Sequence, residues 1–127
     1  MSAGNFFETE RKAFDLRTKK LTTSTSLTTY TARVGGASDN FIVDRVIVVD
    51  GTSGSAMTIT LPNGKYYGQK ILVLLEVYAA TSTVDVDVET VAGTDATQLT
   101  AAGGYTELMW QGSTLGWVEV LISADGS

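Results

Sequence analysis

The sequence contains no cysteine and no histidine among its 127 residues. The absence of cysteine excludes disulfide bonds and thiolate metal sites, and it fits synthesis inside a cell. Without histidine or cysteine, the Ser-His-Asp and Cys-His arrangements of nucleophilic enzymes are impossible, and so is a metal site built on histidine. The sequence therefore predicts a protein that is not an enzyme and has no cofactor.

Proline and long apolar segments are also scarce. The single proline, Pro62, stands against 13 glycines, a composition that suits tight turns between strands. The longest apolar run, Ile71 to Leu75, has the length of a strand and falls far short of the roughly 18–20 residues that a membrane span needs. The N-terminus lacks the basic and apolar regions of a signal peptide. We therefore expect no membrane association.

Charge is divided unevenly along the chain. The first 36 residues carry six Lys or Arg against three acids, a net charge of +3, and the remaining residues carry three against eleven, a net charge of −8. The first segment is also rich in threonine, and the second is a succession of short β-type runs. We interpret this as an extended basic arm over residues 1–40 and a β body over residues 41–127. The acidic body disfavours nucleic acid as a partner.

The spacing of the apolar runs in the body is typical of an all-β sandwich or barrel. Turn chemistry supports this at Leu61-Pro62-Asn63-Gly64, where proline presets φ at the second turn position. Within the arm, acids followed by bases predict one short helix in residues 1–20, and residues 27–33 are a candidate strand. The strands predicted in the body cover residues 41–49, 56–61, 69–78, 82–89, 96–100, 104–110 and 116–123.

Two kinds of strand are expected. After Thr83, residues 84–89 alternate between valine and acid, which is typical of a half-buried antiparallel strand. Residues 46–49 and 71–75 are instead apolar on both faces. Because a sandwich of this size has one interior, the second face must be covered by the chain's own arm or by another subunit. Both possibilities favour an oligomer over a free monomer.

Three groups of residues have alternative interpretations. The row Asp85, Asp87 and Glu89 could bind a cation, but its members stand about 6.5–7 Å apart along a strand, so a solvated outer face is favoured. The basic residues of the arm could bind phosphates, an acidic protein surface, or only water. The aromatic residues could form a sugar-stacking platform, although aromatics in strands are usually core or interface anchors. This aromatic set is Tyr66, Tyr67, Tyr105, Trp110 and Trp117.

Two segments carry a resemblance to a known group of proteins. They are Ile59-Thr-Leu-Pro-Asn-Gly, which leads into an apolar strand, and Gly104-Tyr-Thr-Glu-Leu-Met-Trp-Gln-Gly, which is followed by Trp117. This pattern resembles a β module of tailed-bacteriophage structural proteins, namely capsid decoration (cement) proteins and head or tail fibre proteins. The resemblance covers about residues 41–123. The absence of a long repetitive shaft makes the chain more similar to a cement protein than to a fibre.

The resemblance implies a homotrimer of jelly-roll-like antiparallel sandwiches on the outer capsid surface of the virion, made in the host cytoplasm. Such a protein stabilises the shell by binding neighbouring subunits of the phage major capsid protein. The alternative is a fibre-tip module that binds a receptor or carbohydrate. The candidate shell-binding residues of the arm are Arg11, Lys12, Arg17, Lys19 and Lys20. The candidate subunit-interface or core residues are Ile71, Val73, Leu75, Trp110 and Trp117.

Overall fold

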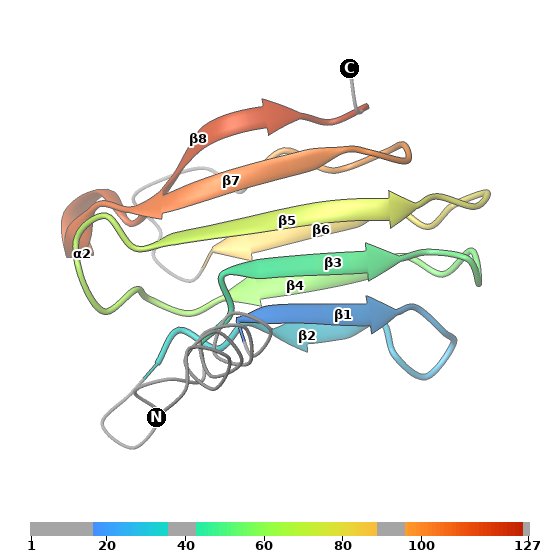
Figure 1. Cartoon of the computed structure of the whole chain (residues 1–127), viewed down its shortest axis with the longest axis horizontal. Coiled ribbons are helices and arrows are strands. Elements are labelled where there is room, and N and C mark those ends of the chain that lie inside the picture. The colour runs from blue at the N-terminus through green and yellow to red at the C-terminus, as the bar shows by residue number, and fades with distance from the viewer. Residues whose placement is uncertain (1–16, 36–42, 89–95, 126–127) are drawn as a thin grey trace, which may run out of the picture.

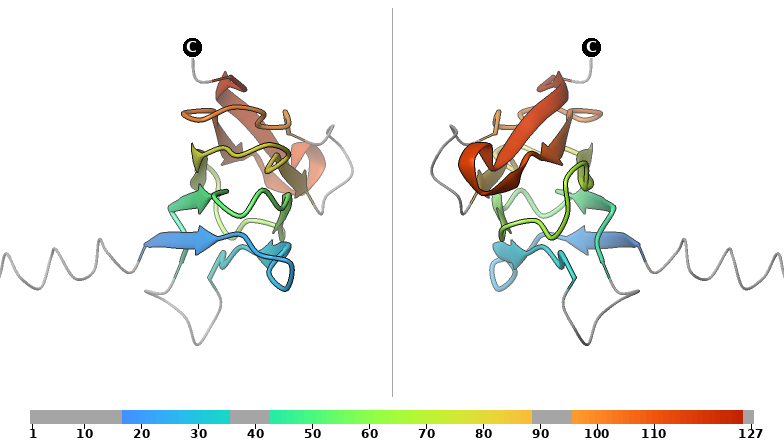
Figure 2. Two further views of the ribbon diagram at one scale, coloured as in Figure 1. Left: turned by 90° about the vertical axis from the view of Figure 1, so that its right-hand side faces the viewer. Right: turned by 90° about the vertical axis from the view of Figure 1, so that its left-hand side faces the viewer.

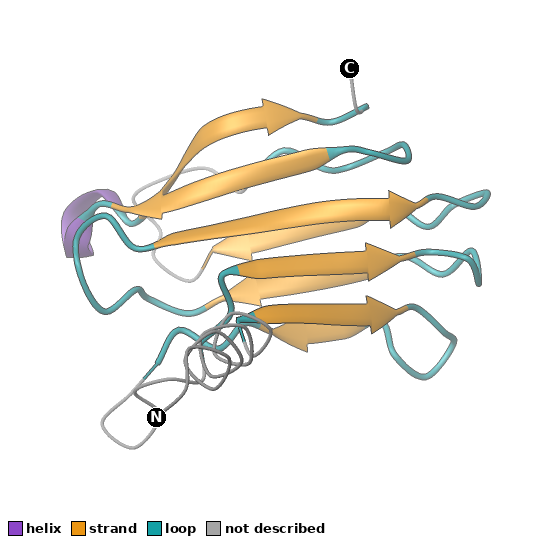
Figure 3. Cartoon of the chain, in the orientation of Figure 1, coloured by secondary structure: helices purple, strands orange, loops and turns teal. Residues whose placement is uncertain are grey.

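A computed structural model describes residues 17–35, 43–88 and 96–125 of the chain (Figure 1). These residues are almost entirely strands and turns, with a single helical turn near the C-terminus (Figure 3). In chain order the elements are β1 (Thr18–Thr22), β2 (Thr29–Thr31), β3 (Val46–Asp50), β4 (Met57–Leu61), β5 (Lys70–Val77), β6 (Val84–Val88), β7 (Tyr105–Trp110), α2 (Gly112–Leu115) and β8 (Trp117–Ser123).

The strands form two sheets that lie face to face (Figures 1 and 2). The first, sheet A, has five strands in the order β1-β3-β5-β7-β8, and the second, sheet B, has three in the order β2-β4-β6. From β1 to β6 the chain alternates between the sheets. Strand β3 therefore pairs with β1, β4 with β2, β5 with β3 and β6 with β4, and all four pairs are parallel. The chain thus winds as a short parallel coil, and each turn gives one strand to each sheet.

The expected all-β class is confirmed, but the expected antiparallel pairing is wrong for the first six strands. Only β5–β7 and β7–β8 are antiparallel pairs. The alternating segment Val84–Val88 pairs in parallel with β4. From β1 to β6, successive strands do not form hairpins, because the chain crosses to the other sheet after each strand. A jelly roll, which is built from antiparallel strands, is therefore not confirmed.

Most strand positions are confirmed, and the boundary of the arm is not. Six of the seven strands predicted in the body are present, whereas in residues 96–100 only Leu99 pairs, through a bridge to Val84. Residues 18–22 and 29–31 form β1 and β2, so part of the predicted arm is the first turn of the coil. The helix predicted in residues 1–20 falls mostly outside the described residues, and its last three positions belong to β1.

At one end of the coil, small polar side chains connect successive turns of the chain. Thr23 Oγ1 lies 2.7 Å from Ser53 Oγ, and Thr81 Oγ1 donates to the carbonyl of Gly54 at 2.9 Å. Gly51 packs so closely that an added Cβ would lie 2.3 Å from Ser82 Oγ. These contacts satisfy polar groups of the loops and hold the turns in register.

The core lies between the sheets and is built from stacked apolar side chains. The register of sheet A aligns Leu21 with Val49 and Val49 with Leu75, and that of sheet B aligns Ile59 with Val86. All five are buried. Parallel stacking in this register lets each turn cover the apolar residues of the next turn. The first turn is therefore part of the core, not an appendage.

Beyond sheet B, the inner side of sheet A is covered by a tryptophan pair and a loop. Trp110 and Trp117 pack edge to face with ring centroids 5.6 Å apart. Trp117 Nε1 donates to the carbonyl of Pro62 at 2.8 Å. At Gly64, an added Cβ would lie 2.4 Å from Trp110 Cγ, so only glycine fits this turn. The turn after β4 therefore folds onto the β7–β8 hairpin.

Candidate assembly surface

Because the chain has no histidine or cysteine, its acidic side chains are the first candidates for a chemical site. No group of three or more acidic residues within the described residues could hold a metal ion. No helix in this part of the chain is long and apolar enough to span a membrane. The two acids with the most side-chain partners, Asp44 and Glu119, are engaged in contacts that connect elements of the fold.

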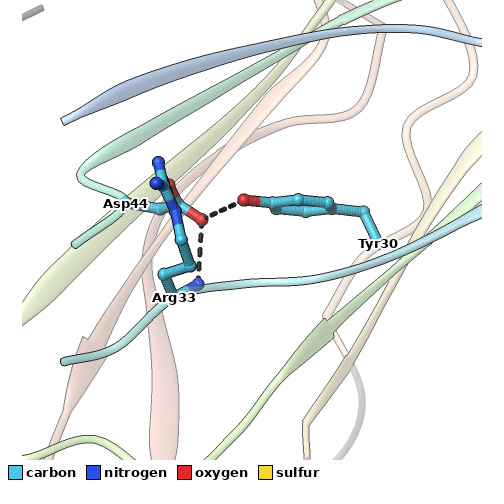
Figure 4. Close-up of polar contacts among 3 residues, drawn as sticks. All are labelled: Tyr30, Arg33 and Asp44. Carbon is cyan, nitrogen blue, oxygen red and sulfur yellow. Dashed lines mark hydrogen bonds and ion pairs between the residues drawn. The ribbon is translucent and has the colours of Figure 1, made fainter. Parts of the chain in front are cut away.

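Asp44 is the most buried acid, and it anchors the connection from β2 to β3 (Figure 4). Its carboxylate accepts from the Tyr30 hydroxyl at 2.7 Å, from the Arg33 backbone N–H at 2.8 Å, and from Arg33 Nε and Nη2 at 3.0 and 2.6 Å. Burial and the hydrogen bond to Asp44 raise the pKa of Tyr30 to about 12, and the same carboxylate raises the pKa of Arg33. This cluster is a structural clamp, because both carboxylate oxygens of the buried Asp44 accept hydrogen bonds from Tyr30 or Arg33.

Glu119 connects β8 to the segment before Leu99. It accepts from the Thr97 backbone N–H at 3.0 Å, from Thr97 Oγ1 at 3.2 Å and from Thr106 Oγ1 at 2.6 Å. These bonds hold residues 96–99 against the end of sheet A. Like Asp44, Glu119 therefore has a structural role, and neither acid faces a second unpaired acid.

Three of the five predicted shell-binding residues, Arg17, Lys19 and Lys20, lie within the described residues. Arg11 and Lys12 lie outside the described residues. The Arg17 carbonyl accepts from the backbone N–H groups of Arg45 and Val46 at 2.7 and 3.0 Å. Lys19 and Lys20 belong to β1: Lys19 Nζ lies 5.8 Å from the Tyr30 ring centroid, and Lys20 pairs with Glu76 at 3.2 Å.

The other predicted site residues lie in the core. Ile71, Val73 and Leu75 are all fully buried between the sheets. Trp110 and Trp117, which were candidates for the core or a subunit interface, are 6% and 2% exposed and belong to the core of the single chain. The apolar residues that remain available for a partner are their neighbours along the same strands.

The outer face of sheet A is unusually apolar for a surface turned away from the core. The register aligns Val46 with Leu72 and Val48 with Leu74, in the middle of the sheet. Each of these side chains alternates with a buried one and points outward, and each remains half-buried. Together with the outward residues of β7 and β8, they form what we call the apolar face: Val46, Val48, Leu72, Leu74, Tyr105, Met109, Val118 and Leu121.

The outer face of sheet B has the opposite character. Its outward positions align in two rows across β2, β4 and β6, and each row reads threonine, threonine, aspartate. The rows are Thr29, Thr58 and Asp85, then Thr31, Thr60 and Asp87. Such a face is well hydrated. The solvated interpretation of Asp85 and Asp87 is consistent with these positions, and Glu89 lies outside the described residues.

Strand β8 extends the apolar face to an open edge. It pairs with β7 alone among the described strands, and it lies beyond the last strand of sheet B (Figure 1). Val118 and Leu121 on the outer side are 39% and 57% exposed, and Val120 and Ile122 are 38% and 48% exposed. An edge strand with exposed apolar side chains is a ready site for contact with another chain.

Sequence reasoning located the apolar runs but named their inward residues as site candidates. The outward residues Val46, Val48, Leu72 and Leu74 were present in the same two-faced runs. The exposed residues of β8 were missed, although the uninterrupted run Val120 to Ile122 carried the signal. Comparison of the chain with known protein families, curated proteins and solved structures finds no match.

Proposed function

We propose that this chain is a structural virion protein that decorates and stabilises a phage capsid as a homotrimer, by binding neighbouring major capsid protein subunits. The observation that carries the proposal is the apolar face on the five-stranded sheet, opposite a polar outer face on sheet B. One surface is suited to a protein partner and the other to water. The resemblance of the 59–64 and 104–117 segments to phage structural modules supplies the biological setting.

Two further observations support a structural role over a catalytic one. The chain has neither histidine nor cysteine, and the buried acid Asp44 is fully occupied by Tyr30 and Arg33. A protein of this kind acts by multivalency: several weak contacts per trimer add up, and binding to the assembled shell stabilises it by mass action. This mechanism does not require a jelly roll.

The test uses phage particles that lack the protein through deletion of its gene. They should lose their DNA at a lower temperature than complete particles, and purified protein added back should restore both occupancy and heat stability. Particles that bind no added protein, or whose heat stability does not change with occupancy, would contradict the proposal. A chain lacking residues 1–16 shows whether attachment depends on Arg11 and Lys12.

A fibre-tip or carbohydrate-binding module is the second candidate, and one observation favours it. Tyr66 and Tyr67 are adjacent and are 64% and 78% exposed, so much of each side chain is accessible to a sugar, although the Tyr67 ring lies against Gly112. The burial of Trp110 and Trp117 removes the rest of the suggested platform. A glycan array separates the two proposals, since binding lost in Tyr67→Ala, with unchanged particle stability, would favour the sugar-binding function.

A further inference from the structure

We infer that the apolar face of sheet A, together with the open edge at β8, is where copies of this chain contact one another. The inference rests on the homotrimer of the proposed function and identifies the surface that forms it. In this inference, the apolar face is covered by a second and a third copy of the same chain and not by the capsid shell.

The size of the face is the first argument. Strand β5 has eight residues, and five strands at about 4.8 Å spacing with about 3.4 Å per residue give a flat footprint of roughly 500 Å². A surface of side chains has more accessible area than its footprint, so this face approaches the roughly 800 Å² per partner of a standard stable interface. Ile122, exposed on the opposite side of β8, extends the apolar surface around the edge of the sheet.

Charge is the second argument. The whole chain carries a net charge of −5, so two copies repel one another over most of their surfaces. The outer side of sheet A is the exception, because the acids Glu76 and Glu107, which stand among the residues of the apolar face, are paired with Lys20 and Arg45 at 3.2 and 3.1 Å. Lys70 adds a further positive charge at the end of β5. An identical face can therefore approach without the like-charge penalty that the Asp85 and Asp87 rows would impose.

The layout also suits three-fold symmetry. Around a three-fold axis each contact is heterologous, so the β1 side of the face on one copy would meet the β8 side of the face on the next copy. An apolar centre with charged residues at its margin is the usual composition of a protein interface. Here Val48, Leu72 and Leu74 lie toward the centre of the sheet, and Lys20 lies on the edge strand β1. One charged residue, Glu107, lies between Leu72 and Leu121 in the register, and it is paired with Arg45.

Two substitutions and two matched controls test the inference on the purified full-length chain. Leu74→Lys places a charge at the centre of the apolar face, and Thr60→Lys places the same charge on a central strand of sheet B; both positions are half-buried. Leu121→Glu changes a side chain that is 57% exposed, and Tyr66→Glu changes one that is 64% exposed, off the face. Since Leu121 contributes little to the single-chain core, Leu121→Glu keeps the test valid if Leu74→Lys does not fold.

Light scattering at micromolar concentration is the measurement, and circular dichroism verifies the fold of each variant. The unmodified chain and both controls should give three times the 13.5 kDa chain mass, and Leu121→Glu and Leu74→Lys should give one chain mass, a threefold drop. A trimer that persists in folded Leu121→Glu overturns the inference but leaves the proposed homotrimer standing. A monomeric unmodified chain overturns the inference and the homotrimer. If that monomer binds capsids and Leu121→Glu does not, the shell is the occupant.

Discussion

The outer faces of the two sheets are built on the same coil but are chemically opposite. The inner faces are alike, since Val49 and Leu75 in sheet A meet Ile59 and Val86 in sheet B as one continuous core. Outside, sheet A presents valine, leucine and methionine, and sheet B presents two rows of threonine and aspartate. Because strand geometry is shared, the difference is not required by folding. Under the proposed function, sheet A contacts protein and sheet B contacts water.

The two faces depend on one core, so removing the first coil turn should affect both. A chain lacking residues 1–33 loses β1, β2 and the buried residues Leu21 and Ala32. A buried leucine alone contributes about 2–5 kcal/mol, against a typical domain stability of about 5–15 kcal/mol. We expect this deletion to abolish cooperative thermal unfolding, whereas a chain lacking residues 1–16 keeps it. Equal melting curves for the two deletions would mean that the first turn is dispensable.

The β7–β8 hairpin, which has no counterpart in sheet B, should depend for its stability on the pair Trp110 and Trp117. Trp117→Ala removes a buried ring and its hydrogen bond to Pro62, and should lower the free energy of unfolding by about 3–5 kcal/mol. Chemical denaturation measures the change. The control is Tyr67→Ala, an aromatic truncation at a side chain that is 78% exposed, which should cost far less. Similar losses at both positions would contradict the packing of β7 and β8 described above.

The connection between the two sheets should depend on Asp44. Asp44→Ala removes four hydrogen bonds and leaves Tyr30 and Arg33 without their acceptor, which should cost about 3 kcal/mol in unfolding free energy. Asp87→Ala, on the exposed outer face of sheet B, is the matched control and should be nearly neutral. If denaturant titration gives the two variants the same stability, Asp44 is not a clamp.

The same cluster predicts a loss of stability in alkali. The raised pKa of Tyr30, about 12, means that the folded state holds its proton where the unfolded state, with an ordinary pKa of 10.0, has lost it. The stabilisation is therefore complete below pH 10 and declines as the pH rises from 10 to 12. The contribution of Tyr30 should be about 1 kcal/mol, discounted for the partial exposure of its ring. Tyr30→Phe should show a correspondingly smaller decline than the unmodified chain, and identical pH profiles would contradict this.

The strands were largely predictable from sequence, but the winding of the chain was not. Alternation in Val84–Val88 and apolar runs at residues 46–49 and 71–75 depend on the immediate neighbours of each residue, and the strands lie there. The pairing of strands depends on which strand, distant in the sequence, lies alongside. Antiparallel pairing was expected, whereas the first six strands pair in parallel. One signal of the winding was present in the sequence. A polar-x-polar motif occurs as Thr-x-Thr at 29–31 and 58–60 and as Asp-x-Asp at 85–87, and this spacing is typical of solenoid repeats.

The apolar face was predictable in kind but not in its residues. Two-faced runs indicated that an outer surface would need cover, which agrees with the apolar face. In Ile71–Leu75, however, both alternating sets are apolar, so a period of two does not tell which set points inward. Only the register with β3 and β7 distinguishes Leu72 and Leu74 from Ile71 and Val73. The open edge at β8 likewise depends on the strand order of the sheet, which no local pattern encodes.

The most direct test of the difference between the faces is cross-linking through a single introduced cysteine. The chain has no cysteine of its own, so each variant has a single reactive thiol. Leu121→Cys marks the apolar face, and Thr60→Cys marks the outer face of sheet B. With a short bismaleimide at micromolar protein, we predict that Leu121→Cys gives covalently joined chains on a denaturing gel and that Thr60→Cys stays as single chains. Joined chains from Thr60→Cys, with single chains from Leu121→Cys, would show that copies meet through sheet B and would contradict the account.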